Sequence, residues 1–363
     1  MRLLMTTDTI GGVWTFNMEL ARGLLAEGCE IVLVSLGRLP SPSQQGEADL
    51  LFAGGKFEYI ATEAPLEWQP ANDSAYTSAE PLLMRLCHDF RPGALLLSQF
   101  CFGALPVPVP KFVISHSDVL SWSAAVSKVS LAEDRWLIHY RNIVQAGLDG
   151  ATLLIAPTHA VLKGMTDHYR LPTETVVIAN GRSLHPETKR IPRVLQAISA
   201  GRMWDPAKNL HLLTGLHAPL PIRIAGENNG YDTQGSSLIF LGQRSESDLL
   251  MLLRESAIYI CASMYEPFGL APLEAALCGC AVVANDIPSL REVWADAALY
   301  FRTADDLEAI LRALTDDAEL LAAAQRRSVL RAQEYTTERM ANHYLQTIRD
   351  LNSCKVNGES RAA

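Results

Sequence analysis

Short apolar segments alternate with longer amphipathic segments along most of the chain. In the first half, the short segments are rich in Val, Ile and Leu, a composition that predicts strands. These predicted strands are residues 2–7, 30–36, 94–100, 111–115, 151–157 and 175–179. Helical spacing of apolar residues predicts helices at residues 14–27, 80–90 and 159–169. Because strands and helices alternate, we predict a parallel sheet that is covered by helices on both faces.

The same alternation begins again after a break near residue 185. Residues 179–192 contain Asn180-Gly181 and two prolines, a combination typical of turns. Beyond this break, strands are predicted at residues 193–200, 221–227, 237–243, 257–263, 280–285 and 298–301. Helices are predicted between them at residues 207–216, 246–256, 268–278 and 288–296. The predicted fold class is therefore α/β, with two similar Rossmann-like parallel-sheet domains.

The length of the chain agrees with two domains. It has 363 residues, and a domain typically has about 150 residues. We place the first domain at residues 1–184 and the second at residues 185–337. The polar residues 352–363 are expected to form a disordered tail.

Composition and charge narrow the class of protein. Hydrophobic residues make up 48% and charged residues 20%, a balance typical of globular proteins. The net charge of −9 repels nucleic acids and anionic lipids, so we expect no nucleic-acid partner and no docking on a membrane.

Cysteine usage and the start of the chain indicate a cytoplasmic protein. The seven cysteines are odd in number and include no C-x-x-C motif, which favours a reducing compartment. The first residues reach Thr and Asp too early for a signal peptide. No segment approaches the roughly 20 continuous apolar residues of a membrane span.

The most informative segment is residues 265–285. A predicted strand ends just before Glu266, and a helix then begins around Phe268, Gly269 and Leu270. Free backbone N–H groups and the helix dipole at such a start favour phosphate binding. Glu274 could accept two ribose hydroxyls, and Glu266 could accept hydroxyls of another polyol. The alternative is that both glutamates are solvated surface residues.

A second candidate site follows the strand at residues 193–200. Arg202 and Lys208 flank a helix start that is marked by Asp205-Pro206. Two cations in this position can hold a diphosphate, because Arg offers a planar fork and Lys a point charge. The alternative interpretation is a pair of surface cations.

The first half offers weaker candidates at the ends of its strands. Gly11 and Gly12 follow the first strand, where a ligand could approach the backbone or the chain could simply turn. His116 closes a strand and could hydrogen-bond a sugar hydroxyl, act as an acid or base, or be a structural residue. Asp118 and Trp122 follow it, and the indole of Trp122 could stack on a sugar ring.

Several motifs are absent from the sequence. It contains no D-x-D, no phosphate-binding P-loop, no G-x-S-x-G and no H-E-x-x-H. We therefore expect no cofactor and no divalent metal. The charge of a leaving group would then have to be met by Arg, Lys and backbone N–H groups.

Residues 266–274, together with Gly201, Arg202 and Lys208, resemble the retaining, nucleotide-sugar-dependent glycosyltransferases with the B-type fold (GT-B). Asn180-Gly181, Gly11-Gly12 and His116 occur in the order of that family, and the resemblance runs from residue 1 to about residue 350. It implies two Rossmann-like domains facing each other across a cleft. Residues 1–184 would bind the acceptor, residues 185–337 the donor, and a helix at residues 338–351 would cross back to the first domain.

The resemblance also implies roles for single residues in the second domain. Arg202 and Lys208 would hold the donor diphosphate, and Glu274 the nucleotide ribose. Glu266 would contact hydroxyls of the transferred sugar. The remaining donor contacts would come from the backbone at Phe268, Gly269 and Leu270 and, for the base, from Gln243 and Arg244.

In the first domain, Gly11 and Gly12 would approach the donor, and His116 would line the sugar pocket near the reacting carbon. Asp118 and Trp122 are weaker candidates for acceptor binding. The catalytic set predicted here is His116, Glu266, Arg202 and Lys208. Two positions depart from the family pattern, since Ser183 replaces an Asp and Asn209 replaces a Gly.

The predicted activity is transfer of a hexose from a nucleoside diphosphate sugar to a hydroxyl acceptor, with retention of configuration and without a metal. Two alternatives stay open. One is a sugar-nucleotide epimerase or hydrolase of the same fold, which would act without an acceptor. The other is a non-catalytic subunit that binds sugar nucleotides.

Overall fold

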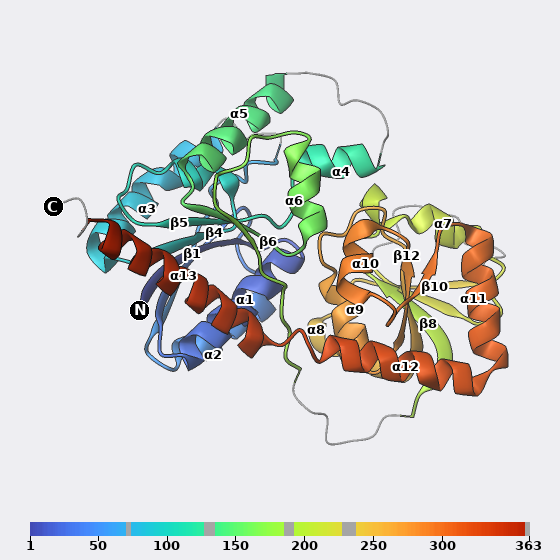
Figure 1. Cartoon of the computed structure of the whole chain (residues 1–363). Helices are drawn as coiled ribbons and strands as arrows, with labels where there is room; N and C mark the ends of the chain where they lie inside the picture. The colour runs from blue at the N-terminus through green and yellow to red at the C-terminus, as the bar shows by residue number, and fades with distance from the viewer. Residues whose placement is uncertain (70–73, 127–134, 185–191, 227–236, 360–363) are drawn as a thin grey trace. The chain divides into compact units, whose positions relative to one another are not determined.

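The computed structural model describes residues 1–69, 74–126, 135–184, 192–226 and 237–359 (Figure 1). The chain divides into two compact units. Unit 1 comprises Met1–Ser121, Ser130–Gly181 and Thr337–Ala363, and unit 2 comprises Trp122–Val129 and Arg182–Thr336. Among the described residues, no helix combines the length and the apolar character needed to cross a membrane.

In the described part of unit 1, seven parallel strands form one sheet in the order β3-β2-β1-β4-β5-β6-β7. The strands are β1 (Arg2–Asp8), β2 (Glu30–Leu36), β3 (Phe57–Ala61), β4 (Ala94–Leu97), β5 (Lys111–Ile114), β6 (Leu153–Ala156) and β7 (Thr175–Val177). Every residue of β4 and β6 is buried, as expected for central strands of a sheet with helices on both faces.

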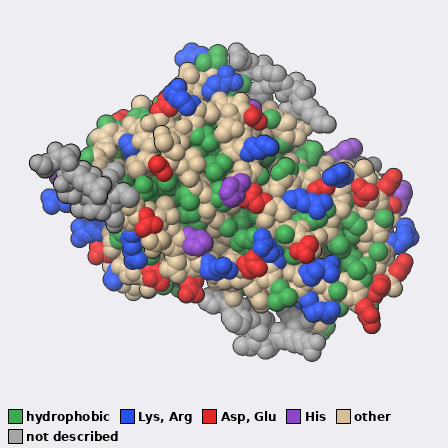
Figure 2. All heavy atoms as spheres, viewed as in Figure 1, with side chains coloured by type: hydrophobic (Ala, Val, Ile, Leu, Met, Phe, Trp, Pro, Cys, Tyr) green, Lys and Arg blue, Asp and Glu red, His purple; other side chains and the backbone are tan. Residues whose placement is uncertain are grey.

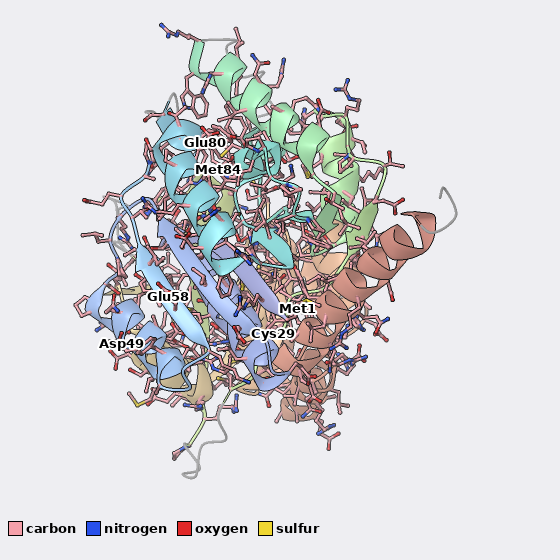
Figure 3. The ribbon with its side chains drawn as sticks, turned by 90° about the vertical axis from the view of Figure 1, so that its left-hand side faces the viewer. Met1, Cys29, Asp49, Glu58, Glu80 and Met84 are labelled. Atoms are coloured by element: carbon pink, nitrogen blue, oxygen red, sulfur yellow. The ribbon has the colours of Figure 1, made fainter. Side chains whose placement is uncertain are left out.

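The helices of unit 1 connect successive strands. They are α1 (Gly12–Ala26), α2 (Pro42–Phe52), α3 (Ala75–Phe90), η2 (Phe100–Ala104), α5 (Arg135–Gly150) and α6 (His159–Thr166), and α4 (Val119–Val126) is divided between the two units. Figure 3 shows α3 with Glu80 and Met84 labelled, and Glu58 on the edge strand β3. Glu58 is exposed, and a charge on an edge strand discourages pairing with another chain.

The last helix, α13 (Thr337–Glu359), belongs to unit 1 and packs on α1. A Cβ added at Gly23 of α1 would lie 2.6 Å from the Cβ of Ala341, so the small residue allows the two helices to approach closely. The Thr337 hydroxyl donates to the buried carboxylate of Glu19. The helix continues past Leu351 into the segment that we expected to be a disordered tail.

In the described part of unit 2, six parallel strands form a second sheet in the order β10-β9-β8-β11-β12-β13. The strands are β8 (Val194–Ala200), β9 (Ile222–Ala225), β10 (Leu238–Gly242), β11 (Ser256–Cys261), β12 (Ala281–Asn285) and β13 (Leu299–Phe301). The helices are η3 (Pro206–Lys208), α7 (Leu210–Thr214), α8 (Glu246–Glu255), α9 (Leu270–Leu277), α10 (Pro288–Trp294), α11 (Ala304–Asp316) and α12 (Ala318–Ala332). The predicted pair of parallel-sheet Rossmann-like domains is confirmed.

The strand order reverses once in each sheet, between β1 and β4 in unit 1 and between β8 and β11 in unit 2. In open parallel sheets, ligands bind beyond the carboxyl ends of the strands at such a reversal. In unit 2 the loops at this point carry Arg202, Lys208 and Glu266. In unit 1 they carry Gly11 and Gly12. The topology therefore places the sequence-predicted residues where each sheet can receive a ligand.

Candidate active site

An ion pair between Lys208 and Glu266 lies at the centre of the candidate site in unit 2. Lys208 Nζ is 2.6 Å from Glu266 Oε2, and the side chains are only 20% and 15% exposed. The chain reaches Lys208 from β8 through Gly201 and the short helix η3. A Cβ on Gly201 would lie 3.3 Å from Lys208 Cε, so this glycine leaves room for the lysine side chain.

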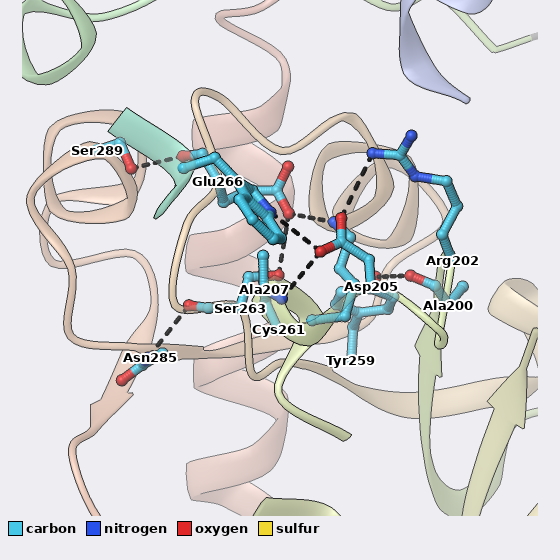
Figure 4. Close-up of polar contacts among 12 residues, drawn as sticks. Ala200, Arg202, Asp205, Ala207, Tyr259, Cys261, Ser263, Glu266, Asn285 and Ser289 are labelled. Carbon is cyan, nitrogen blue, oxygen red and sulfur yellow. Dashed lines mark hydrogen bonds and ion pairs between the residues drawn. The ribbon is translucent and has the colours of Figure 1, made fainter. Parts of the chain in front are cut away.

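Two serine hydroxyls hold Glu266, and a third hydrogen bond holds the segment that carries one of these serines (Figure 4). Ser263 Oγ, just after β11, donates to Glu266 Oε2 at 3.0 Å. Ser289 Oγ, on α10, donates to the Glu266 carbonyl oxygen at 2.5 Å. Asn285 Nδ2, at the end of β12, donates to the Ser263 carbonyl at 3.1 Å. Ser263, Ser289 and Asn285 were not predicted as site residues, although Ser263 and Asn285 lie where predicted strands end.

Burial and charge act in opposite directions on Lys208. Burial lowers the pKa of its ammonium group, but the Glu266 carboxylate raises it by charge attraction and a hydrogen bond, and the net pKa is raised. Lys208 is therefore a cation at neutral pH. A permanent positive charge in a mostly dry position suits the binding of an anion.

Arg202 lies beside the buried residue Asp205. Arg202 Nη2 is 3.5 Å from Asp205 Oδ2, and the guanidinium lies 5.4 Å from the ring centroid of Trp204. Asp205 Oδ1 also accepts the backbone N–H of Ala207 at 2.9 Å, which caps η3. The Arg202 side chain is 42% exposed. Asp205 thus caps the helix that carries Lys208 and also pairs with the more exposed Arg202.

Trp122 and Asp118 lie in different surroundings from each other. Trp122 groups with unit 2, where its indole N–H donates to Asp205 Oδ1 at 3.1 Å. Asp118, in unit 1, is buried, and its Oδ1 accepts the backbone N–H groups of Leu120 and Ser121, both at 3.0 Å. The structure therefore does not bring these two acceptor candidates together in one unit.

The start of α9 is closely packed at Gly269, which is buried. Gly269 has a φ of +92°, and an added Cβ would lie 2.7 Å from Pro272 Cγ and 3.3 Å from Glu266 Cγ. Phe268 is buried and packs edge-on against Tyr335, with ring centroids 5.3 Å apart. Leu270 is the first residue of the helix. Only glycine fits at position 269, and it brings the helix start next to Glu266.

Glu274 is buried inside α9 and is bound by an arginine that the sequence analysis did not single out. Arg182 Nε is 2.9 Å from Glu274 Oε1, and the arginine also pairs with Glu246 at the start of α8. Gln243 and Arg244 are exposed in the loop between β10 and α8. Within the described residues, no hydrogen bond or ion pair joins these two side chains to the Lys208–Glu266 pair.

One departure from the family pattern has a structural explanation. Asn209, where the family often has Gly, adopts a φ of +54° between η3 and α7. This left-handed conformation is easy for Gly, and Asn tolerates it better than most other residues. The loop after Lys208 can therefore keep the turn that a Gly would make.

The hydrogen bonds around His116 in unit 1 join neutral polar groups. Asn17 Nδ2, on α1, is 3.0 Å from the Val13 carbonyl and 2.9 Å from Ser98 Oγ. Ser98 Oγ in turn is 3.1 Å from His116 Nε2. The His116 ring packs edge-on against Phe16 at 4.6 Å. Ser98 and Asn17 were not predicted.

Burial lowers the pKa of His116 to about 3. The imidazole is therefore neutral near pH 7 and is not a ready general acid there. Of the alternatives that the sequence left open, hydrogen bonding to a hydroxyl fits this environment best. Gly11, with a φ of +67°, and Gly12 are exposed at the start of α1 in the same unit.

Two further observations describe the surface and the possible metal ligands. On the face shown in Figure 2, acidic and basic side chains are interspersed. In the part of the chain that the structure describes, no three His, Cys, Asp or Glu side chains form a group that could hold a metal ion.

Comparisons with known proteins agree with this architecture. The model of the family "Glycosyltransferase Family 4" matches residues 10–185, and that of "Glycosyl transferases group 1" matches residues 222–329. The serotype-specific mannosyltransferase WbdA of Escherichia coli is 31% identical over 250 residues, which cover 64% of this chain. The chain spans only 29% of the length of that mannosyltransferase.

Two other proteins are similar along nearly their whole length. A glycogen synthase of Mycobacterium tuberculosis is 27% identical over 93% of this chain and 91% of its own. The solved structure of sucrose-phosphate synthase from Thermosynechococcus elongatus superposes with a TM-score of 0.76 at 15% identity, covering 97% of this chain and 99% of that one. With two matching family models and two parallel-sheet units, the chain belongs to the glycosyltransferases of the GT-B fold.

Proposed function

We propose that the protein transfers a hexose from a nucleoside diphosphate sugar to a hydroxyl acceptor, with retention of the anomeric configuration. The observation that carries this proposal is the Lys208–Glu266 pair beside the Gly269 start of α9. The pair lies at the strand-order reversal of the unit 2 sheet. Cations, a carboxylate and the backbone at a helix start are groups that can bind a diphosphate linked to a sugar.

In this proposal, the leaving diphosphate is stabilised by the protein itself. The Lys208 ammonium, the Arg202 guanidinium and the backbone at residues 268–270 supply positive charge and N–H donors. Preorganised donors of this kind, aimed at developing negative charge, are commonly the largest contribution to catalysis. We therefore propose that the reaction needs no divalent metal.

Glu266 is assigned to the hydroxyls of the transferred sugar rather than to nucleophilic attack. Its Oε2 already accepts hydrogen bonds from Lys208 Nζ at 2.6 Å and from Ser263 Oγ at 3.0 Å. A carboxylate oxygen engaged in this way is a weakened nucleophile. Retention would then follow from reaction on one face of the sugar, with the departing phosphate taking the proton of the acceptor.

In unit 1, the neutral His116 is assigned to a hydrogen bond with a sugar hydroxyl. Its position after β5 and its contact with Ser98 hold the ring in place. Gly11 and Gly12 are assigned to the approach of the donor along the backbone of α1, and Gln243 and Arg244 to the nucleotide base. Asp118 and Trp122 remain candidates for acceptor binding.

The proposal is tested by turnover assays with a panel of nucleoside diphosphate hexoses in EDTA. Mannose and glucose donors come first, because the relatives are named a mannosyltransferase and a glycogen synthase. Simple sugars and oligosaccharides serve as acceptors, products are detected by mass spectrometry, and NMR couplings report the anomeric configuration. We expect a glycoside with the configuration of the donor.

Other products would contradict the proposal. An inverted glycoside would exclude retention, and turnover that appears only with Mg²⁺ would exclude the metal-independent reaction. Epimerised or free sugar as the sole product, with every acceptor failing, would favour an epimerase or hydrolase. Donor binding without any turnover would favour a non-catalytic subunit.

A further inference from the structure

We propose that Arg182 is a positioning residue for the donor, which orients the Glu274 carboxylate toward the nucleotide ribose. The inference rests on the proposed function, to which we add the role that the resemblance implies for Glu274, the binding of the ribose hydroxyls. It adds a residue that lies outside the Glu266–Glu274 segment, directly after the Asn180-Gly181 turn.

The contacts of Arg182 join two parts of the donor region. Its Nε lies 2.9 Å from Glu274 Oε1 on α9, and its Nη2 pairs with Glu246, the first residue of α8. The side chain of Arg182 is 4% exposed, that of Glu274 is 11% exposed and that of Glu246 is 52% exposed. The buried guanidinium therefore pairs with one mostly buried carboxylate, that of Glu274, and one half-exposed carboxylate, that of Glu246.

The backbone of Arg182 is fixed to the same support as the start of α9. Its N–H donates to the Tyr335 carbonyl at 2.9 Å. The Tyr335 ring packs edge-on against Phe268, two residues before the first residue of α9. The arginine and the helix that carries Glu274 therefore share one anchor, which keeps their separation constant.

The chemistry of arginine suits this role. Its planar fork directs N–H donors along fixed lines, so that one guanidinium can hold two carboxylates in defined orientations. A lysine would offer one mobile point charge instead. Because Arg182 fixes Oε1, the carboxylate plane of Glu274 cannot rotate freely. The ribose hydroxyls therefore meet a hydrogen-bond acceptor that is already oriented. Preorganisation of this kind reduces the entropy lost on binding.

The inference predicts a specific loss of ribose recognition. A buried site that hydrogen-bonds a substrate hydroxyl rejects the analogue that lacks it, because a polar group is left unpaired. If Arg182 orients Glu274, Arg182→Met should remove this discrimination. A residue with a merely structural role would weaken binding of both ligands by the same factor and leave their ratio unchanged.

The experiment compares ligand pairs by isothermal titration calorimetry on the full chain. UDP, GDP and ADP are titrated first, and the base that binds is then tested against its 2′-deoxy and 3′-deoxy diphosphates. We expect the wild type to prefer the ribonucleotide by roughly 10- to 100-fold, the range expected for one oriented hydroxyl contact. Arg182→Met should reduce this preference to within about threefold, and Arg182→Lys should give an intermediate value.

Arg223→Met is the matched control. Arg223 forms an ion pair of 3.5 Å with Glu255 elsewhere in unit 2, and the two side chains are 29% and 35% exposed. The control should keep the wild-type preference. If Arg182→Met does not fold, judged by its thermal unfolding, Arg182→Lys retains a cation and supplies the comparison.

Each outcome has a defined meaning. A folded Arg182 variant with the wild-type preference would overturn the inference and leave the proposed function intact. A wild type that binds the diphosphates but does not distinguish ribose from deoxyribose would also overturn it. A wild type that binds none of the diphosphates would overturn the proposed function and the inference with it.

Discussion

The two sheets have the same topology at the edge where their strands end, but the side chains that contact each other at this edge differ. In unit 2, the loops after β8 and β11 carry the ion pair between Lys208 and Glu266. In unit 1, the loops after β4 and β5 carry the hydrogen bond between Ser98 and His116. The topology is therefore not what distinguishes the two edges. The difference lies in the two contacts, an ion pair in unit 2 and a hydrogen bond between neutral groups in unit 1. It fits our proposal that a diphosphate binds in unit 2 and a sugar hydroxyl binds His116.

Burial lowers the pKa of a basic side chain at each edge, but the net shift of the pKa depends on the neighbouring groups. It lowers the pKa of His116 to about 3, with no opposing charge. It also lowers the pKa of Lys208, but there the Glu266 carboxylate outweighs it and the net pKa is raised. The same desolvation thus yields a neutral base in unit 1 and a stable cation in unit 2.

The largest expected effect comes from removing the charge of Lys208 in unit 2. Lys208→Met should lower turnover by about 10²- to 10³-fold, the usual cost of deleting one donor to a developing negative charge. The exposed Lys56→Met in unit 1 is the control and should leave turnover unchanged. Steady-state kinetics with the preferred donor measures both. Wild-type turnover in Lys208→Met would remove this lysine from the chemistry.

The next effect concerns stability. Glu266→Gln leaves the Lys208 ammonium without its carboxylate in a mostly buried position, so the free energy of unfolding should fall by about 2–3 kcal/mol. The double variant Lys208→Met with Glu266→Gln should be more stable than Glu266→Gln alone, because no unpaired charge remains. Urea denaturation measures the three variants. Equal stability of Glu266→Gln and the double variant would show that the unpaired Lys208 ammonium does not destabilise the fold.

The third prediction uses the pH dependence of His116. Because its pKa is about 3 in the folded state and about 6.5 when unfolded, the unfolded chain binds more protons between these values. Stability therefore falls as the pH drops below about 6.5. Between pH 7 and pH 5, the wild type should lose about 1–2 kcal/mol more than His116→Gln. Parallel urea curves at the two pH values would test this, and identical losses would show that His116 titrates normally.

The smallest expected effect comes from the backbone at the start of α9. Gly269→Ala should lower the free energy of unfolding by about 1–2 kcal/mol more than Gly28→Ala. Both glycines have positive φ, of +92° and +81°, but only the Cβ at position 269 would meet other atoms. Thermal unfolding measures stability and calorimetry measures donor affinity. We expect weaker donor binding in Gly269→Ala alone, and equal effects would indicate that the close approach is unimportant.

More of the strands of unit 2 than of unit 1 could be predicted from the sequence, and the reason is physical. The strands of unit 2 consist mostly of apolar residues, and each was predicted. In unit 1, β3 was missed because its alternation of polar and apolar residues is short, with exposed Glu58 inside it. Helix α2 was missed because only Ala48 is buried, so it has no apolar stripe to detect.

The candidate residues divide in a similar way. Glu266 and Glu274 were found because their spacing falls within one strand–loop–helix segment. Arg182 was missed because its partner Glu274 lies 92 positions further along the chain, and only the fold brings them together. Asn17 and Ser98 were missed because neutral residues of this kind occur throughout helices and loops. Long-range pairs of this type leave no local pattern.

Our central proposal is that the protein binds the donor diphosphate through Lys208, Arg202 and the backbone at the start of α9. The most direct measurement is calorimetry in EDTA of a nucleoside diphosphate and the matching nucleoside, with the wild type and Lys208→Met. We expect the wild type to bind the diphosphate at least about 100-fold more tightly than the nucleoside, and Lys208→Met to lose most of this preference. An unchanged preference in Lys208→Met, or binding that appears only when Mg²⁺ is added, would contradict the account.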